Sequence, residues 1–309
     1  MTEPKICMVG SSNIDLIARV PRLPAPGETL IGSKFQMGFG GKGANQAVMA
    51  AKLGAQVSVV TKLGKDIFGD DTRRNYESHG IDTTFVLVDD ERFSGVAPIT
   101  VDDNTGQNSI IIVPGANDGL SPADARAAAS VIQNADVLIC QLEIPLETTL
   151  EALRIAREAG DRVLTILNPA PAAEIPDEMI ALADIFVPNE VEARMLTGLD
   201  ASTPETAETA ARALQRRGAK TVIVTLGDRG ALLVEGDQPG QHIAAEKVQA
   251  VDSTGAGDSF VGSFAYLIGR GTPIAEAVRL ACAIATRSVL KPGTQVSFPT
   301  RAEVRDLIG

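Results

Sequence analysis

Short apolar segments rich in β-branched residues alternate with longer helical segments along most of this chain of 309 residues. The predicted strands are Ile6–Val9, Val57–Val60, Val137–Cys140, Val163–Leu167, Ile185–Val187 and Val222–Thr225. The predicted helices are Ala44–Leu53, Ala123–Asn134, Glu147–Ala159, 204–218, Gly257–Ile268 and Ile274–Leu290. Repeated strand–helix units require parallel strands joined by crossover helices. We therefore predict an α/β fold, a doubly wound and mostly parallel sheet with helices on both faces.

Two segments interrupt this alternation. Residues 16–37 hold three prolines among short alternating stretches, and residues 94–113 contain two short predicted strands, Gly95–Val101 and Asn108–Val113, joined by a polar turn. We expect both segments to form antiparallel strands outside the main sheet, as a small β-sheet lid. The sequence has no internal repeat and no long linker, so residues 1–309 are expected to form a single domain.

Composition excludes several classes of function. The chain has no run of 18 apolar residues and no N-terminal leader pattern, so we expect neither a membrane span nor secretion. A net charge of −11 and 4% aromatic residues argue against a nucleic-acid partner. The three cysteines, Cys7, Cys140 and Cys282, lie far apart in apolar segments, which indicates reduced thiols in a cytoplasmic protein.

The most informative motif is Asp252-Ser-Thr-Gly-Ala-Gly-Asp258, which precedes an apolar helical segment. The N–H groups of Gly255, Ala256 and Gly257 would converge at the N-terminus of that helix, where the helix dipole favours anions. Such an anion hole suits the charge that develops on a transferred phosphoryl group. The Asp258 carboxylate would lie beside it and could accept a proton from a hydroxyl group. The alternative is a tight turn with Asp258 as a helix cap, but the full string before an apolar helix favours catalysis.

A second glycine-rich string, Gly38-Phe-Gly-Gly-Lys-Gly-Ala-Asn-Gln46, contains the pattern G-x-G-x-x-G. It does not fit a dinucleotide site, because it lies outside the first strand–helix turn and the strand Val57–Thr61 ends without an acidic residue. A nicotinamide oxidoreductase is therefore disfavoured. Since Gly43 follows Lys42, it is not a Walker A loop either. The string is either a backbone-rich wall against a polyhydroxylated ligand, with Lys42 and Asn45 as donors, or a plain turn into a helix.

Polar residues follow several predicted strands, at the edge where parallel sheets bind ligands. Asn13 and Asp15 follow the first strand, and Glu143 follows another. Polar groups that converge from different strands suit a sugar, whose hydroxyls both donate and accept hydrogen bonds. Taken singly, each of these residues could instead serve as a cap or an Asx turn.

Three further loops, 168–171, 188–192 and 225–230, also follow apolar strands. Glu192 is a candidate for holding hydrated magnesium, which favours carboxylates and keeps its waters. The glycines of 225–230 could let a nucleotide approach the backbone. The alternative is that all three are ordinary turns without a binding role.

Taken together, these motifs resemble the ribokinase (PfkB) family of sugar kinases over essentially the whole chain. Gly40–Gln46 and Asp252–Asp258 match the two family signatures, and Asn189…Glu192 and Gly293–Pro299 match further motifs. The resemblance implies a ribokinase-like fold that uses ATP, magnesium and potassium. It also implies transfer of phosphate to the 5-hydroxyl of D-ribose with Asp258 as general base, and a homodimer formed through the lid.

The resemblance also implies roles for individual residues. The catalytic group is Asp258 with Gly255, Ala256 and Gly257. The sugar contacts are Asn13, Asp15, Gly41, Lys42, Asn45, Glu143 and Asp258. The nucleotide contacts are Asn189, Thr225, Leu226, Gly227, Asp228, Arg229, Gly230, Gly257 and Cys282. Glu192 is linked to magnesium through water, and potassium is bound by Asp252, Thr254, Ser288, Lys291, Gly293 and Ser297.

The choice of sugar stays open at this stage. Residues 66–99 also resemble deoxyribokinases, but those relatives tend to carry Met where this chain has Asn13, which favours ribose. Cys282 lies where relatives often place Asn or His against adenine. The alternatives are a kinase for 2-deoxyribose, another pentose or a nucleoside, and a non-catalytic sugar-binding regulator. The intact Asp258 and Gly255–Gly257 argue against the regulator.

Overall fold

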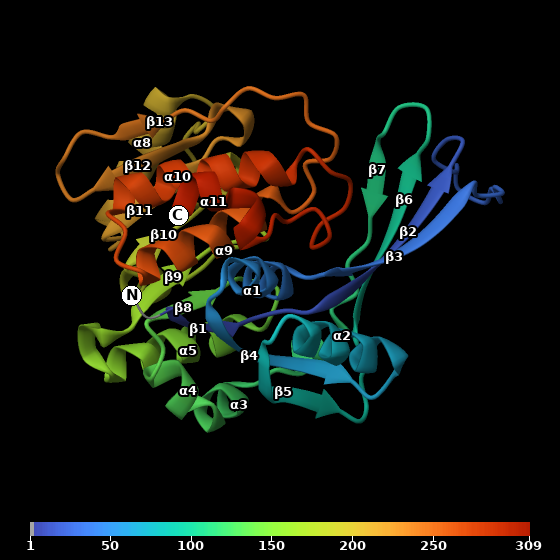
Figure 1. The fold of residues 1–309 in the computed structure, drawn as a ribbon, viewed down its shortest axis with the longest axis horizontal. Coiled ribbons are helices and arrows are strands. Elements are labelled where there is room, and N and C mark those ends of the chain that lie inside the picture. Colours follow the sequence, from blue (N-terminus) through green and yellow to red (C-terminus); the bar gives the residue numbers. More distant parts are fainter. Residues whose placement is uncertain (1–2) are drawn as a thin grey trace.

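A nine-stranded sheet forms the centre of the computed structural model, which describes residues 3–309 (Figure 1). Its strand order is β13-β12-β11-β10-β9-β8-β1-β4-β5, with every pair parallel from β11 to β5 and antiparallel pairs at β11–β12 and β12–β13. The strands are β1 (Lys5–Val9), β4 (Gln56–Gly64), β5 (Asp82–Asp89), β8 (Val137–Cys140), β9 (Leu164–Leu167), β10 (Ile185–Phe186), β11 (Thr221–Thr225), β12 (Ala231–Glu235) and β13 (Gln241–Ile243). The predicted mostly parallel α/β sheet is confirmed.

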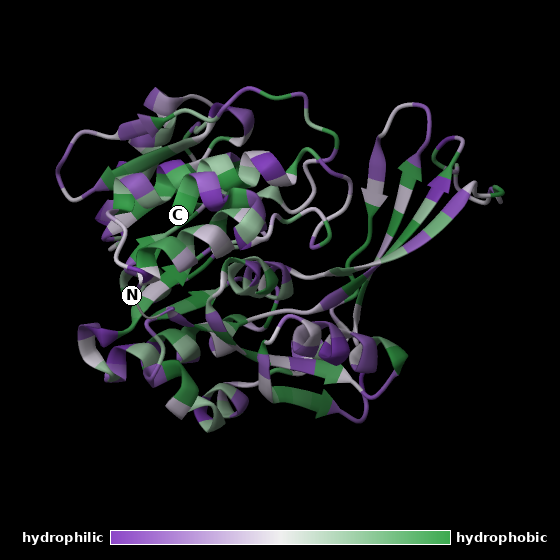
Figure 2. Cartoon of the chain, viewed as in Figure 1, coloured by the Kyte–Doolittle hydropathy of each residue, from purple (hydrophilic) through white to green (hydrophobic). Residues whose placement is uncertain are grey.

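Helices cover both faces of this sheet, because side chains alternate between two apolar layers along each strand. Ile6 and Met8 of β1 face one layer, and Cys7 and Val9 face the other. The first layer holds α1 (Lys42–Leu53), α2 (Ile67–Ser78), α9 (Ala256–Gly269), α10 (Ile274–Ser288) and α11 (Arg305–Ile308). The second holds α3 (Pro122–Ala127), α4 (Ala129–Gln133), α5 (Leu146–Glu158), α6 (Asp177–Leu182), α7 (Glu190–Thr197) and α8 (Pro204–Arg216). Figure 2 shows the apolar colouring concentrated on the central strands.

The predicted helix Ala123–Asn134 is wrong as a single element. Ser121 and Asp124 form a capping box that starts α3 as expected, with Pro122 in the first turn. The amide of Ala128 then hydrogen-bonds to the carbonyls of both Asp124 and Ala125, which tightens the turn and ends α3. Since Ala128 is fully buried, packing onto the sheet favours this break over a straight helix.

A second sheet projects from the main body (Figure 1). Its order is β3-β2-β6-β7, with β2 (Asn13–Val20), β3 (Lys34–Gly40), β6 (Gly95–Asp102) and β7 (Asn108–Ile110). The β2–β3 and β6–β7 pairs are antiparallel, but β2 and β6 are parallel. The all-antiparallel prediction is therefore wrong for the central pair, because two hairpins join through their first strands, which run the same way. The strand β2 also starts at Asn13, three residues before the predicted boundary.

No helix within residues 3–309 is long and apolar enough to cross a membrane. The three cysteines are buried and free.

Candidate active site

Asp258 lies in the first turn of α9, where α9 packs against α1. Its carboxylate is buried and accepts two hydrogen bonds, from Asn45 Nδ2 to Oδ2 and from Gln46 Nε2 to Oδ1, each of 2.9 Å. Both donors come from the first turns of α1, so the glycine-rich string and the Asp258 motif meet as predicted. Burial raises the pKa of Asp258, against the lowering effects of Lys42, Asn45 and Gln46. A carboxylate of raised pKa and fixed orientation is suited to accept a proton.

Carboxylates surround Lys42. Burial alone would lower its pKa, but Asp258, Glu143 and Glu192 outweigh burial, so the pKa of Lys42 is raised and its ammonium stays charged. Glu143 Oε2 accepts from the Lys42 backbone amide at 2.9 Å, which holds the end of β8 against the start of α1. Burial, with the charges of Glu143 and Asp258, raises the pKa of Asp15 to about 7. The site thus balances several acids against one lysine.

The turn before α9 needs glycine at its first position. Gly255 has φ +77, and a Cβ there would lie 2.4 Å from Thr294 Cγ2. Within residues 3–309 the amides of Gly255 and Gly257 have no hydrogen-bond acceptor, whereas the Ala256 amide donates to Ser253 O at 3.2 Å. Two of the three predicted amides are therefore free to bind an anion at the helix N-terminus.

Asn13 lies at the start of β2, at the junction of the two sheets, and is 4% exposed. Its Oδ1 accepts from Asn117 Nδ2 at 2.8 Å, and Asn117 Oδ1 accepts from the Ser12 amide at 2.9 Å. Since a backbone N–H can only donate, Asn117 must turn its amide nitrogen toward Asn13. The Asn13 Nδ2 is thereby left as the free donor.

Gly41 closes this corner from the other side. It precedes α1 with φ +86, and a Cβ there would lie 2.7 Å from the Asn13 amide nitrogen. A side chain at position 41 would push apart the two segments that bring Asn13 and Lys42 together. This close approach explains the glycine in structural terms.

A cavity of about 410 Å³ reaches the N-terminus of α9, where Ala256 and Gly257 form part of its wall. The predicted nucleotide contacts that line it are Thr225, Gly227, Asp228, Gly230, Gly257 and Cys282. The other three predicted contacts, Asn189, Leu226 and Arg229, are not part of the lining. Leu226 is fully buried in the core, Arg229 pairs with Glu190, and Asn189 bonds to Glu192. Burial raises the pKa of the Cys282 thiol to about 12, so it faces the cavity as a neutral group.

The segment after β13 was missed as part of this cavity. Residues 245–248 and Ala250 form one wall without regular secondary structure. The rest of the lining is formed by Ser253, Phe260, Ala285, Thr286 and Val289. A Cβ on Gly230 would lie 2.0 Å from Ile243 O, so the predicted glycine turn packs directly on this wall. In the sequence, only Gly230 indicated that another segment lies close to this turn.

Asn189 and Glu192 form the capping box of α7. The Glu192 carboxylate accepts from the Asn189 amide and Asn189 Nδ2 at 2.8 and 2.9 Å, and Glu192 is 3% exposed. Burial raises the pKa of Glu192, opposed by these hydrogen bonds and by Lys42. Both carboxylate oxygens are already bonded, so water-mediated contact to a cation fits this residue better than direct ligation.

Oxygen donors gather where the loop after α10 meets the Asp258 motif. Asp252 accepts from the amides of Thr254 and Gly293, both at 2.9 Å. Burial works against ionisation of Asp252, but these hydrogen bonds outweigh it and lower its pKa. The hydroxyl of Ser288 donates to Ala285 O, and that of Ser297 donates to Thr294 O. The lone pairs of both hydroxyl oxygens therefore remain available to a cation. Lys291 Nζ pairs with Glu303, so only its carbonyl could join a cation site.

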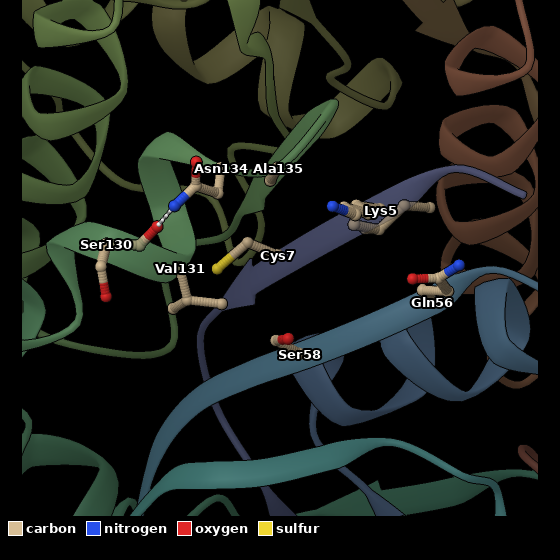
Figure 3. Close-up of a pocket in the computed structure, with 9 residues that line it drawn as sticks. Lys5, Cys7, Gln56, Ser58, Ser130, Val131, Asn134 and Ala135 are labelled. Carbon is tan, nitrogen blue, oxygen red and sulfur yellow. Dashed lines mark hydrogen bonds between the residues drawn. The ribbon is translucent and has the colours of Figure 1, made fainter. Parts of the chain in front are cut away.

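A second hollow, of about 340 Å³, lies at the opposite end of β1 and β4 (Figure 3). Lys5 and Gln56 stand at its rim, and Ser130 and Asn134 border it from α4 and the residue after it. Burial raises the pKa of Cys7, the other ionisable residue in its lining, to about 12. No carboxylate and no glycine turn line this hollow, so the arrangement around Asp258 is the better candidate for catalysis.

Comparison with known proteins finds relatives that match almost the whole chain. The family model for pfkB family carbohydrate kinase matches residues 3–301. The chain is 45% identical to deoxyribokinase of Salmonella typhi over 296 residues, 96% of this chain and 95% of that one. It is 45% identical to ribokinase of Mus musculus over 303 residues, 97% and 93% of the two chains. The structure of Arabidopsis thaliana ribokinase complexed with ribose and ATP matches 99% of both chains, with 33% identity and a TM-score of 0.90.

Proposed function

The chain belongs to the pfkB family of carbohydrate kinases, and from this we propose that it is an ATP-dependent sugar kinase that phosphorylates the 5-hydroxyl of D-ribose. The observation that carries the proposal is the buried Asp258, held by two amide donors beside the free amides of Gly255 and Gly257. A base next to an anion hole is what transfer of a phosphoryl group to a hydroxyl requires. The ribokinases of mouse and Arabidopsis support ribose as the acceptor.

In this mechanism Asp258 accepts the proton of the 5-hydroxyl as the hydroxyl oxygen attacks the terminal phosphorus of ATP. The bond from that phosphorus to the bridging oxygen breaks, and ADP leaves with its electron pair. Asn45 and Gln46 each hold one carboxylate oxygen of Asp258, which fixes the orientation of the base. The amides of Gly255 and Gly257, at the positive end of α9, stabilise the negative charge on the phosphoryl group in flight. Lys42 keeps its charge among the acids and offsets their repulsion of the phosphates.

The sugar is bound at the junction of the two sheets. We assign its contacts to Asn13, Asp15, Gly41, Lys42, Asn45, Glu143 and Asp258. Their donors and acceptors are mixed, as a sugar with several hydroxyls requires. The Asn13 Nδ2 is a free donor there, and the Asp15 carboxyl, with a pKa of about 7, can either donate or accept.

The nucleotide occupies the cavity that ends at Gly257. We assign its contacts to Asn189, Thr225, Leu226, Gly227, Asp228, Arg229, Gly230, Gly257 and Cys282, with Leu226 and Arg229 acting through their backbone. Glu192 would hold magnesium through water. When bound, that ion neutralises charge on the phosphates.

Potassium fits the oxygen donors beside the anion hole. We assign it to Asp252, Thr254, Ser288, Lys291, Gly293 and Ser297, several of them through backbone carbonyls. A monovalent cation there would supply charge that fixes the backbone leading to Gly255–Gly257. The side chain of Asp252 already ties that backbone to the loop through Gly293.

The small sheet acts as the lid of a single-domain enzyme, residues 1–309. Asn13 and Asp15 stand where it joins the main body, so its position decides access to the sugar. Phe35, Met37 and Ile110–Val113 expose apolar side chains on or beside the small sheet, which supports a homodimer formed through it. We place the enzyme in the cytoplasm, since its three buried thiols are free.

A 2-deoxyribose kinase is the second candidate, because deoxyribokinase of Salmonella typhi is as similar to the chain as mouse ribokinase is. The deciding experiment is a panel of pentoses, hexoses and nucleosides with coupled detection of ADP. Ribose should have the highest kcat/KM. A higher value for 2-deoxyribose would select the second candidate, and no sugar-dependent ADP release would refute the kinase.

A further inference from the structure

Asp258 stands at the end of a chain of three side-chain amides. Asn75 Nδ2 donates to Gln295 Oε1 at 2.9 Å, and Gln295 Nε2 donates to Asn45 Oδ1 at 3.0 Å. Asn45 Nδ2 then donates to Asp258 Oδ2 at 2.9 Å. The chain runs from α2 through the loop after α10 to α1, so it joins three elements that are far apart in sequence.

A second amide chain reaches the other carboxylate oxygen. Gln141 Nε2 donates to Gln46 Oε1 at 2.6 Å, and Gln46 Nε2 donates to Asp258 Oδ1 at 2.9 Å. Gln141 Oε1 ends this chain without a partner, the one such fully buried side-chain atom in residues 3–309. A buried acceptor without a donor is unfavourable, so some stronger demand must fix the orientation of Gln141.

That demand comes from Asp258. An ionised carboxylate only accepts hydrogen bonds, so Asn45 and Gln46 must both turn their NH2 groups toward it. Their oxygens then face away, and the next amide in each chain must donate in turn. The same direction passes outward to Asn75 in one chain and leaves Gln141 Oε1 unpaired in the other.

We propose that Asn75 and Gln295 are positioning residues for Asp258: they fix the Asn45 amide in the orientation that donates to the base and tie the base to the loop 291–297. The proposal rests on the kinase function proposed above. Lys52 supports it, since its Nζ donates to Gln295 O at 2.6 Å and to Phe298 O at 2.9 Å. The loop is thus anchored to α1 by both the backbone and the side chain of Gln295.

Asn75→Asp tests the direction of the chain with almost no change in shape. A carboxylate at position 75 accepts only, so Gln295 must turn its Nε2 toward it and its Oε1 toward Asn45. Asn45 then either turns its own oxygen toward Asp258 or faces oxygen with oxygen. The first result replaces a donor to the ionised base with an acceptor. The second keeps the donor but places two oxygens against each other at Asn45, which weakens the hold of Asn45 on the base. Asn75→Ala deletes the outer partner without reversing the chain, and Ser78→Asp adds the same charge at an exposed position on α2.

Two readouts separate positioning from general damage. The first is the pH profile of kcat, whose acidic limb reports ionisation of the base. The second is the ¹³C shift of the Asp258 carboxyl followed with pH in the sugar-free enzyme, which needs no turnover. The charged groups around Asp258 are Lys42, Glu143, Asp15 and Glu192, and all four are retained in every variant.

For Asn75→Asp we expect the Asp258 midpoint to rise by about 1 pH unit and kcat at neutral pH to fall by about tenfold, with KM for ATP unchanged. Asn75→Ala should show a much smaller effect, and Ser78→Asp almost none. Equal shifts for Asn75→Asp and Ser78→Asp would reduce the effect to added charge and overturn the proposal, as would a wild-type midpoint and wild-type kcat in both Asn75 variants. If the wild type phosphorylates no sugar, the proposed function fails. The titration midpoint of the Asp258 carboxyl still tests whether Asn75 and Gln295 orient Asn45.

Discussion

Replacing Asn13 by Met should narrow or reverse the preference for ribose over 2-deoxyribose. Asn13 is 4% exposed, and its Oδ1 is engaged by Asn117. Within residues 3–309, Gln141 Oε1 is the one fully buried side-chain nitrogen or oxygen without a hydrogen-bond partner. Asn13 Nδ2 also has no partner, so it must be accessible to solvent. We expect the 2-hydroxyl of ribose to accept a hydrogen bond from this nitrogen.

The size of the preference follows from what 2-deoxyribose leaves unpaired. A buried donor without an acceptor costs about 1–3 kcal/mol, which is about a five- to 150-fold difference, since about 1.4 kcal/mol is tenfold. The wild type should therefore prefer ribose in kcat/KM by a factor within that range. Methionine offers an apolar surface, so the penalty should fall on the hydroxyl of ribose instead.

The assay is kcat/KM for both sugars, measured by coupled ADP release on the wild type and on Asn13→Met. Asn108→Met is the matched control, because it makes the same substitution at an exposed position on β7 of the small sheet. Its sugar ratio should equal that of the wild type. Equal efficiency of the two sugars on the wild type, or an unchanged ratio in Asn13→Met, would show that Asn13 is not the discriminator.

Three further predictions concern the acids of the site. Asp258→Asn should keep sugar and ATP binding and lose about 10²–10⁴-fold in kcat; more than about a third of wild-type turnover would refute its role as base. Activity should be higher in potassium than in tetramethylammonium, because a cation held by Asp252 and its loop would order the anion hole, and equal rates would exclude that site. Asp15→Asn should stabilise the sugar-free protein at pH 8, since the folded-state pKa of Asp15 lies near 7 instead of 3.8, a difference worth at most about 4 kcal/mol. The raised pKa means that the contribution of Asp15 to wild-type stability falls as pH rises from about 4 to 7, so this gain should vanish near pH 4 in thermal unfolding. A gain of the same size at both pH values would contradict it.

The sequence predicts the framework well because its signals are local. Each predicted strand of the main sheet overlaps an observed one, and the motif around Asp258 begins α9 as expected. The family resemblance, confirmed by the match over residues 3–301, depends on the same contiguous strings. The edge strands β5 and β13, and β12 beside β13, were missed. They lie outside the predicted strand–helix alternation or carry few apolar residues at their ends.

Long-range pairing explains the remaining errors. The parallel contact of β2 with β6 joins residues about 80 positions apart. Neither strand's sequence indicates whether its partner runs parallel or antiparallel. The residues that orient Asp258 are also hidden in the sequence. Asn75 sits in a polar helix and Gln295 in a loop, where an amide is ordinarily read as a surface group. Only the folded chain shows that both lie in one line of hydrogen bonds with Asn45.

Two features of the proposed site are unfavourable for the folded chain. Asp15 is desolvated among other acids, and the amides of Gly255 and Gly257 have no acceptor within residues 3–309. Neither of these features helps the folded chain on its own, and ordinary packing would remove each of them. They make sense together if the site is complementary to what it binds: hydroxyls for the acids and a phosphoryl group for the turn. A ligand that supplies those partners forms the hydrogen bonds that the free site lacks. The groups that make the free site less stable therefore stabilise the bound substrate and the transition state.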